Sequence, residues 1–283
     1  MSIGGIITAM VTPFDGDGRV DEQAAADLIR HLLEHGSDGV VMASTTGEAS
    51  TLDDEEKLRL FSLAASEAGD ATVVANTGSN DTRHSVELTE KASAIDGVDA
   101  ILAVTPYYNK PNRRGIVAHF HAIADATDLP VIVYNIPSRC VIDIPNDLLQ
   151  ELAQVENIAG VKQARAEDLA PIDGMDVLAG NDDMLADVLD IGGTGGILVA
   201  SQIAGEEMRR MIDEPDQRRQ IDEGLQDLYT ALSITVNPIP VKTAMRMLGH
   251  EVGGFRLPLV EPSEEEAEEI RVVLDRRGLL SAV

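Results

Sequence analysis

Short runs of β-branched and other apolar residues alternate with longer amphipathic stretches along most of this chain. The alternation predicts βα units and a parallel sheet. Eight such units within about 200 residues fit a closed barrel better than an open doubly wound sheet. We therefore expect a (β/α)8 TIM barrel over residues 1–204, with strands at 6–10, 39–43, 72–75, 100–104, 131–134, 158–161, 177–179 and 196–199.

Helices are expected between these strands, most clearly at 21–35, 53–68, 80–94, 113–126 and 145–153. Asp53 followed by Glu56 is typical of a capping box, and Pro145 suits the start of a helix. From about residue 205 onward the pattern looks wholly helical. No Gly/Ser linker or low-complexity segment sets this part apart, so we expect 205–283 to pack on the barrel within one structural unit.

The charge of the chain restricts its partners. Asp and Glu number 49 against 22 Lys and Arg, a formal net charge of -27, and only five residues are lysines. Such a chain is a poor ligand for nucleic acid. In molar salt the Debye length falls to roughly 3 Å, which screens the self-repulsion. We interpret the composition as the surface of a halophilic protein, with an acidic mesophilic protein as the alternative.

The sequence predicts neither a membrane segment nor a secretion signal. It contains no uncharged apolar stretch of 18 residues, and the N-terminus lacks a basic region followed by a hydrophobic one. We therefore expect a soluble cytoplasmic protein. The single cysteine, Cys140, excludes an intrachain disulfide and a thiolate metal cluster.

Lys162 is the most informative single residue. In a barrel of this kind the catalytic groups lie at the carboxyl ends of the strands, and Lys162 follows the apolar run 158–161. Burial at such a place lowers the pKa of a lysine and provides a neutral amine that can attack a ketone. The alternative is a lysine whose ammonium reaches the surface or pairs with a carboxylate.

Three further segments carry chemical groups at expected strand ends. Tyr134 ends the preceding strand, where its phenol could move protons, although a core tyrosine is the alternative. Thr45, Thr46 and Gly47 offer hydroxyl and N–H groups for a small carboxylate, but could form an ordinary loop. Arg139 could bind the carboxylate of a second substrate, or balance acidic neighbours at the surface.

Several motifs follow one another along the chain: 44–48 (Ser-Thr-Thr-Gly-Glu), 105–111 (Thr-Pro-Tyr-Tyr-Asn-Lys-Pro), 134–139 (Tyr-Asn-Ile-Pro-Ser-Arg), the strand ending in Lys162, 237–242 (Asn-Pro-Ile-Pro-Val-Lys) and 256–259 (Arg-Leu-Pro-Leu). Together they resemble the dihydrodipicolinate synthase and N-acetylneuraminate lyase family. The resemblance is collinear over essentially the whole chain. No single motif would be sufficient.

The resemblance implies roles for individual residues. Lys162 would form the imine with pyruvate and Tyr134 would shuttle protons. Thr45 would link Tyr134 to Tyr108, which is expected to reach in from a neighbouring subunit. That arrangement implies a homotetramer built from tight dimers.

Three more positions are implied to bind pyruvate. Thr46 would hold the pyruvate carboxylate, while Gly180 and Ile197 would place backbone against the imine. The family's reaction implies no cofactor beyond the covalent imine on Lys162, and no metal.

The second substrate is implied by the segment 137–139 (Pro-Ser-Arg). It resembles the synthases, whose arginine holds the carboxylate of aspartate semialdehyde on the route to diaminopimelate and lysine. Departures from the synthase pattern occur at 140–141, 163–165 and 199–202. A 2-keto-3-deoxygluconate or 2-keto-3-deoxy-6-phosphogluconate aldolase, with Arg165 binding the phosphate, is therefore the alternative. A non-catalytic barrel that acts as a binding protein is the second.

Metal and nucleotide chemistry are not expected. The histidine pairs His31/His35 and His119/His121 fall on expected helices, away from the strand ends. The glycine-rich segment 192–196 precedes a strand and does not join a strand to a helix, so it lacks the geometry of a phosphate-binding loop.

Feedback by lysine is expected to be weak or absent. Lysine-inhibited relatives use acidic and histidine side chains at a dimer-interface site. The corresponding positions here are Asp54, Lys57, Asn80 and His84. Asn80 is retained, but a lysine and a histidine stand where a cationic effector would need other partners.

Overall fold

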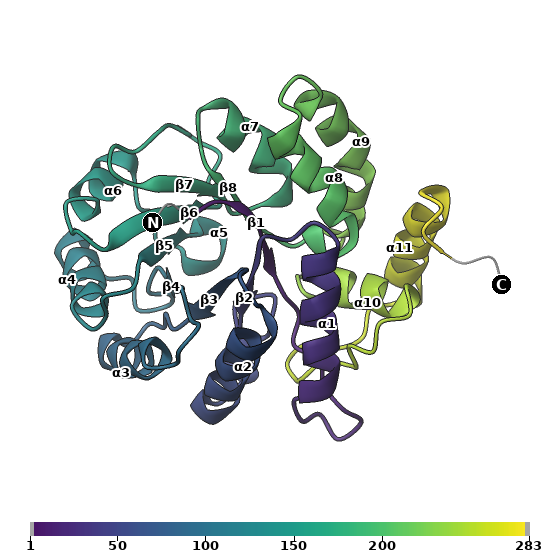
Figure 1. Cartoon of the computed structure of the whole chain (residues 1–283), viewed down its shortest axis with the longest axis horizontal. Helices are drawn as coiled ribbons and strands as arrows, with labels where there is room; N and C mark the ends of the chain where they lie inside the picture. The colour runs from purple at the N-terminus through teal and green to yellow at the C-terminus, as the bar shows by residue number, and fades with distance from the viewer. Residues whose placement is uncertain (1–2, 281–283) are drawn as a thin grey trace.

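The computed structural model describes residues 3–280 and contains a closed parallel barrel. Within these residues eight strands pair in chain order, and β8 closes the ring by pairing with β1 (Figure 1). The predicted barrel is confirmed, with each strand boundary within two residues of its expected place. The strands are β1 Gly5–Ala9, β2 Gly39–Met42, β3 Thr72–Asn76, β4 Ala100–Val104, β5 Val131–Asn135, β6 Ile158–Gln163, β7 Asp176–Ala179 and β8 Gly195–Leu198.

Helices surround the barrel, as expected for βα units (Figure 1). Asp53 and Glu56 form the predicted capping box at the start of α2, each side chain accepting the other's backbone N–H. The surrounding helices are α1 Glu22–Glu34, α2 Asp54–Glu67, α3 Thr82–Ser93, α4 Arg113–Ala124, α5 Pro137–Cys140, α6 Asn146–Leu152, α7 Leu185–Asp190 and α8 Ser201–Asp213, with short 3-10 turns η1 Ala49–Thr51 and η2 Asp182–Met184.

Alternate residues of each strand face opposite sides, which divides the core in two. Ile7, Val41, Leu102 and Ile197 belong to a cluster inside the barrel, whereas the larger cluster fills the space between strands and helices. Burying both faces of the sheet explains why the strands read as continuous apolar runs. It also leaves the carboxyl ends of the strands as the place where polar side chains can gather.

The C-terminal part adds α9 Arg218–Ala231, α10 Ile239–Met247 and α11 Glu264–Arg276, which gather on the side of the barrel next to α8 and α1 (Figure 1). The expected boundary after residue 204 falls inside α8, at Ala204, where φ and ψ are -123° and 38°. None of the helices between residues 3 and 280 combines the length and apolarity needed to cross a bilayer.

The expectation that this part is wholly helical is wrong for residues 248–263, which form no helix. Gly253 adopts a φ of 67°, and a Cβ there would lie 1.8 Å from the carbonyl oxygen of Phe14. Pro258 and Pro262 cannot donate a backbone hydrogen bond. The segment is therefore fitted against the β1 loop in an irregular path instead of continuing a helix.

Candidate active site

A cavity of about 620 Å³ opens at the carboxyl ends of the strands. Helix α9 and the segment before α10 contribute its outer wall, so residues far apart in the sequence meet there. Its lining includes Thr45, Thr46, Tyr134, Arg139, Lys162, Gly180, Asp182, Tyr229 and Asn237.

Lys162 enters this cavity from β6 and is only 3% exposed. It lies within the strand and not after it, because Gln163 continues the pairing with Asn135 of β5. Burial lowers the pKa of Lys162 to about 7; Asp182 opposes this shift and Arg139 adds to it. In a large fraction of the molecules Lys162 is therefore a neutral amine near pH 7, the form that attacks a carbonyl carbon.

Tyr134 stands beside Lys162 because the two residues are direct partners in the β5–β6 pairing. Its side chain is buried, and the Nζ of Lys162 lies 4.2 Å from the centroid of its ring. Burial raises the pKa of Tyr134 to about 12, with Arg139 and the Thr45 hydroxyl acting in the opposite direction. The phenol is protonated at neutral pH, as a group that donates a proton must be.

The turn after β2 holds Thr45 and Thr46 at the edge of the cavity. The Nδ2 of Asn237 donates to the Oγ1 of Thr46 over 3.0 Å, and the hydroxyl of Thr12 donates to the carbonyl of Gly47 over 2.7 Å. The C-terminal part and the β1 loop therefore hold this turn from two sides.

Glu48 follows the turn and forms a buried ion pair. The Nζ of Lys242 lies 2.9 Å from its carboxylate and also donates to the carbonyl of Thr12 over 2.7 Å. The second carboxylate oxygen accepts the backbone N–H of Arg256 over 3.0 Å. Both side chains of the pair are fully buried, which links the turn to α10 through a charged contact shielded from water.

The two candidate arginines differ in their surroundings. Arg139 is exposed, lines the cavity, and its guanidinium donates to the carbonyl of Asn237 over 3.4 Å. Arg165 forms ion pairs with acidic neighbours outside the lining of the cavity: its Nε lies 2.9 Å from Asp143, and its guanidinium also contacts Asp168. The structure thus brings Arg139 to Lys162 and leaves Arg165 paired elsewhere.

The remaining expected residues are distributed unevenly. Gly180 lines the cavity, and its N–H donates to the carbonyl of Gln163 over 2.8 Å. Ile197 is buried in the cluster inside the barrel. Tyr108 is 89% exposed with a φ of 73°, so a single chain does not bring it to the other site residues.

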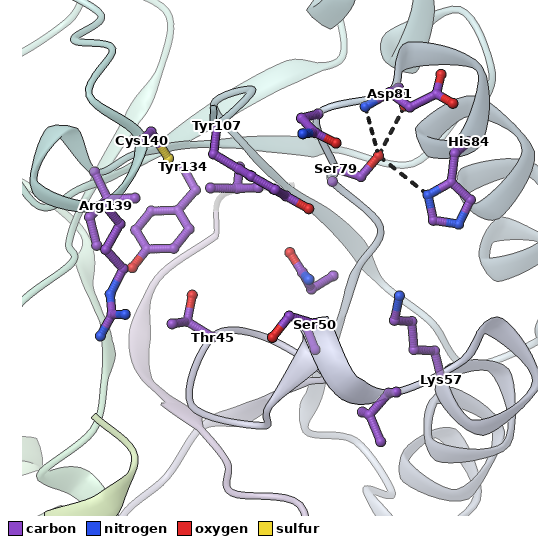
Figure 2. A pocket seen from close by; sticks show the side chains of 17 residues that line it. Thr45, Ser50, Lys57, Ser79, Asp81, His84, Tyr107, Tyr134, Arg139 and Cys140 are labelled. Carbon is purple, nitrogen blue, oxygen red and sulfur yellow. Dashed lines mark hydrogen bonds between the residues drawn. The ribbon is translucent and has the colours of Figure 1, made fainter. Parts of the chain in front are cut away.

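A second cavity of about 470 Å³, drawn in Figure 2, shares lining residues with the first. Thr45, Tyr134 and Arg139 face both cavities, while Lys57 and His84 lie on the far side of the second. All four residues of the expected effector region occur around it: Lys57, Asn80 and His84 line it, and Asp54 contacts both Lys57 and His84.

Asp182, Tyr229 and Asn237 are among the cavity residues that were not predicted as site residues. Asp182 stands three residues beyond β7, a position that the strand-end rule would have selected for inspection. Tyr229 lies on α9, and its buried hydroxyl has no hydrogen-bond partner among the described residues. No local signal marks Tyr229, because only the packing of α9 brings it to the barrel. Residues 3–280 contain no group of three His, Cys, Asp or Glu side chains placed to hold a metal.

A desolvated lysine paired with a buried tyrosine at the end of a barrel strand agrees with the family comparison. The family model described as "Dihydrodipicolinate synthetase family" matches residues 2–277. The chain belongs to this family. The resemblance is thereby confirmed, and with it the enzyme class: a pyruvate-dependent lyase that acts through a lysine Schiff base without a cofactor.

Relatives in the dihydrodipicolinate synthetase family match along nearly the whole chain. The 4-hydroxy-tetrahydrodipicolinate synthase of Moorella thermoacetica is 43% identical, covering 99% of this chain and 100% of the relative. Its counterpart from Desulforudis audaxviator is 41% identical, covering 99% of both. Their names agree with the synthase predicted from the sequence, and not with the sugar-acid aldolase alternative.

Solved structures of the family share the fold closely. Dihydrodipicolinate synthase from Cyanidioschyzon merolae, solved with lysine bound, has a TM-score of 0.94 at 39% identity and covers 98% of this chain and 99% of its own. The chloride-inhibited enzyme from Acinetobacter baumannii, complexed with pyruvate, has a TM-score of 0.94 at 36% identity and covers 99% and 100%.

Proposed function

We propose that this chain is a 4-hydroxy-tetrahydrodipicolinate synthase that condenses pyruvate with aspartate semialdehyde. The observation that carries the proposal is the desolvated Lys162 in direct register with the buried Tyr134. The names of the relatives support the same activity.

The reaction begins at the amine of Lys162. Its lone pair attacks the keto carbon of pyruvate and the C–N bond forms. The former keto oxygen takes one proton from the nitrogen and one delivered through Tyr134, and it leaves as water, so that a protonated imine remains. Removal of a methyl proton gives an enamine, whose carbon attacks the aldehyde. Tyr134 carries protons in these steps, in a relay with Thr45 and with Tyr108 of the partner subunit.

The two substrates occupy different walls of the cavity. Thr46 and the backbone at Gly180 and Ile197 hold the pyruvate part. Arg139 binds the carboxylate of the aldehyde, because its guanidinium reaches the same cavity as Lys162. The sugar-acid aldolase alternative is less well supported, since its phosphate ligand, Arg165, is paired with Asp143.

The proposed assembly is a homotetramer of tight dimers. The proposed location is the cytoplasm of a halophilic organism. The exposed Tyr108 supports a dimer, because the relay needs that hydroxyl beside Thr45 of another chain. The net charge of -27 supports work in high salt.

A product assay in molar KCl tests the function. Pyruvate with aspartate semialdehyde is supplied in one set and 2-keto-3-deoxy-6-phosphogluconate alone in another, with Lys162→Ala as the blank. Condensation in the first set that depends on Lys162 is the expected result. Cleavage in the second set without condensation in the first would replace the synthase with a sugar-acid aldolase.

A further inference from the structure

Asp182 is a carboxylate in the same cavity as Lys162 that the mechanism above does not use. It comes from the loop after β7, the strand that neighbours β6 in the barrel, where Lys162 pairs with Leu178. Lys162 itself makes no ion pair among the described residues. Asp182 and Lys162 therefore line one cavity without a direct ion pair between them.

One oxygen of this carboxylate has a structural task. The Oδ1 of Asp182 accepts the backbone N–H groups of Val199 and Ala200, over 2.8 Å and 3.0 Å. These groups lie at the junction of β8 and α8, so Asp182 ties the β7 loop to the end of β8. Among residues 3–280 the Oδ2 of Asp182 takes part in no hydrogen bond or ion pair.

The charge of this carboxylate acts on Lys162 through space. Asp182 raises the pKa of Lys162 against the larger effect of burial. Burial raises the pKa of Asp182 to about 6, while the two backbone N–H groups and Lys162 act in the opposite direction. The other charged or titratable groups that line this cavity are Tyr134 from β5, Arg139 from α5, Asp183 beside Asp182, and Tyr229 from α9.

We propose that Asp182 supplies the counter-charge for the cationic nitrogen that forms on Lys162, while its other oxygen holds the β8–α8 junction. This inference rests on the proposed function, because the cation arises when Lys162 joins the keto carbon and the keto oxygen leaves as water, with one proton from nitrogen and one delivered through Tyr134, while one proton stays on nitrogen. The carboxylate of pyruvate itself is bonded to the imine carbon, next to the cationic nitrogen. Asp182 provides a fixed negative charge before pyruvate arrives and after the product leaves.

Two substitutions separate the charge from the structural task. Asp182→Asn removes the charge but keeps an oxygen that accepts the two N–H groups, whereas Asp182→Ala removes both. The readout is the rate of pyruvate-dependent borohydride trapping on Lys162 as a function of pH, together with KM and kcat. Asp187→Asn is the matched control, since it removes an exposed carboxylate of α7 that is paired with Arg219.

For Asp182→Asn we expect the half-maximal pH of trapping to fall by about one unit, because the ammonium form of Lys162 loses its stabilising charge. We expect kcat to fall by roughly tenfold, since one pH unit corresponds to a tenfold change in equilibrium. Asp187→Asn should leave both unchanged. Asp182→Ala should show the same shift with a higher KM for pyruvate.

An unchanged half-maximal pH in Asp182→Asn, combined with lost activity in Asp182→Ala, would reduce Asp182 to a structural residue and overturn the proposal. The wild-type profile provides a check that needs no variant: the acid limb should show a second inflection near pH 6 from Asp182 itself. A single inflection would contradict the charge role. Absence of any adduct in the wild type would instead refute the proposed function.

Discussion

The Nζ of Lys162 lies 4.2 Å from the centroid of the Tyr134 ring, and the two residues are partners in the β5–β6 pairing. The contact places an amine whose pKa is lowered to about 7 beside a phenol whose pKa is raised to about 12. Burial drives both shifts, and in each case it favours the neutral form. The pair thus presents a neutral amine and a protonated phenol near neutral pH.

The first prediction concerns the nucleophile. The rate of imine formation should rise with pH and level off above about 7, because the amine of Lys162 must lose its proton before it attacks. Lys162→Ala should lower kcat by on the order of 1,000-fold or more and prevent trapping by borohydride. Mass spectrometry of the trapped peptide checks the site, and an adduct on any of the other four lysines would contradict the assignment.

Tyr134→Phe tests the proton donor. The substitution keeps the ring that packs against Lys162 and removes only the hydroxyl, so the free energy of unfolding should change little. We expect kcat to fall by about 100-fold or more, the usual contribution of a positioned acid or base. Steady-state kinetics and thermal unfolding together check this. A loss of stability with normal kcat would make Tyr134 a core residue.

Arg139→Gln and Arg165→Gln form a matched pair. Loss of Arg139 should raise the KM for aspartate semialdehyde by roughly 10- to 100-fold, the value of one or two charge-assisted hydrogen bonds, with little change in the KM for pyruvate. Loss of Arg165 should leave both KM values near wild type, because its guanidinium contacts Asp143 and Asp168. The reverse pattern would point to the phosphorylated sugar-acid substrate.

The buried pair of Glu48 and Lys242 should matter for stability. Lys242→Met leaves the Glu48 carboxylate without its cation, and removing one partner of a buried pair costs about 3–5 kcal/mol of unfolding free energy. The double variant Glu48→Gln/Lys242→Met should recover part of this loss. Chemical denaturation in constant high salt measures both. Equal losses in the single and double variants would show that packing, and not charge, is responsible.

Lysine is expected to inhibit weakly or not at all. A cationic effector in the second cavity would meet the side chain of Lys57, and the carboxylate of Asp54 is already in contact with Lys57 and His84. Initial rates at millimolar lysine check this expectation. Lys57→Ala provides the comparison: if repulsion by Lys57 is the reason, inhibition should appear or strengthen in that variant. Strong inhibition of the wild type would show the expectation to be wrong.

The local sequence determined the barrel and the position of the proposed nucleophile, Lys162. Strand periodicity is a property of neighbouring residues, so the eight strands and the run before Lys162 could be predicted. The order of the strands makes β5 and β6 neighbours, whereas the register that pairs Tyr134 with Lys162 is seen only in the structure. The path of 248–263 was missed, because its conformation depends on contact with Phe14 and not on its own pattern.

Only the tertiary structure decided what surrounds Lys162. Asn237 reaches Thr46 across 191 residues, and Lys242 reaches Glu48 across 194. Asp143 holds Arg165 away from the cavity, whereas Arg139 points into it. Asp182 is three residues from a strand end, but its effect on Lys162 arises only when two strands close the barrel side by side. Charge and desolvation act through space, so the pKa of each group is set by neighbours that the order of residues does not reveal.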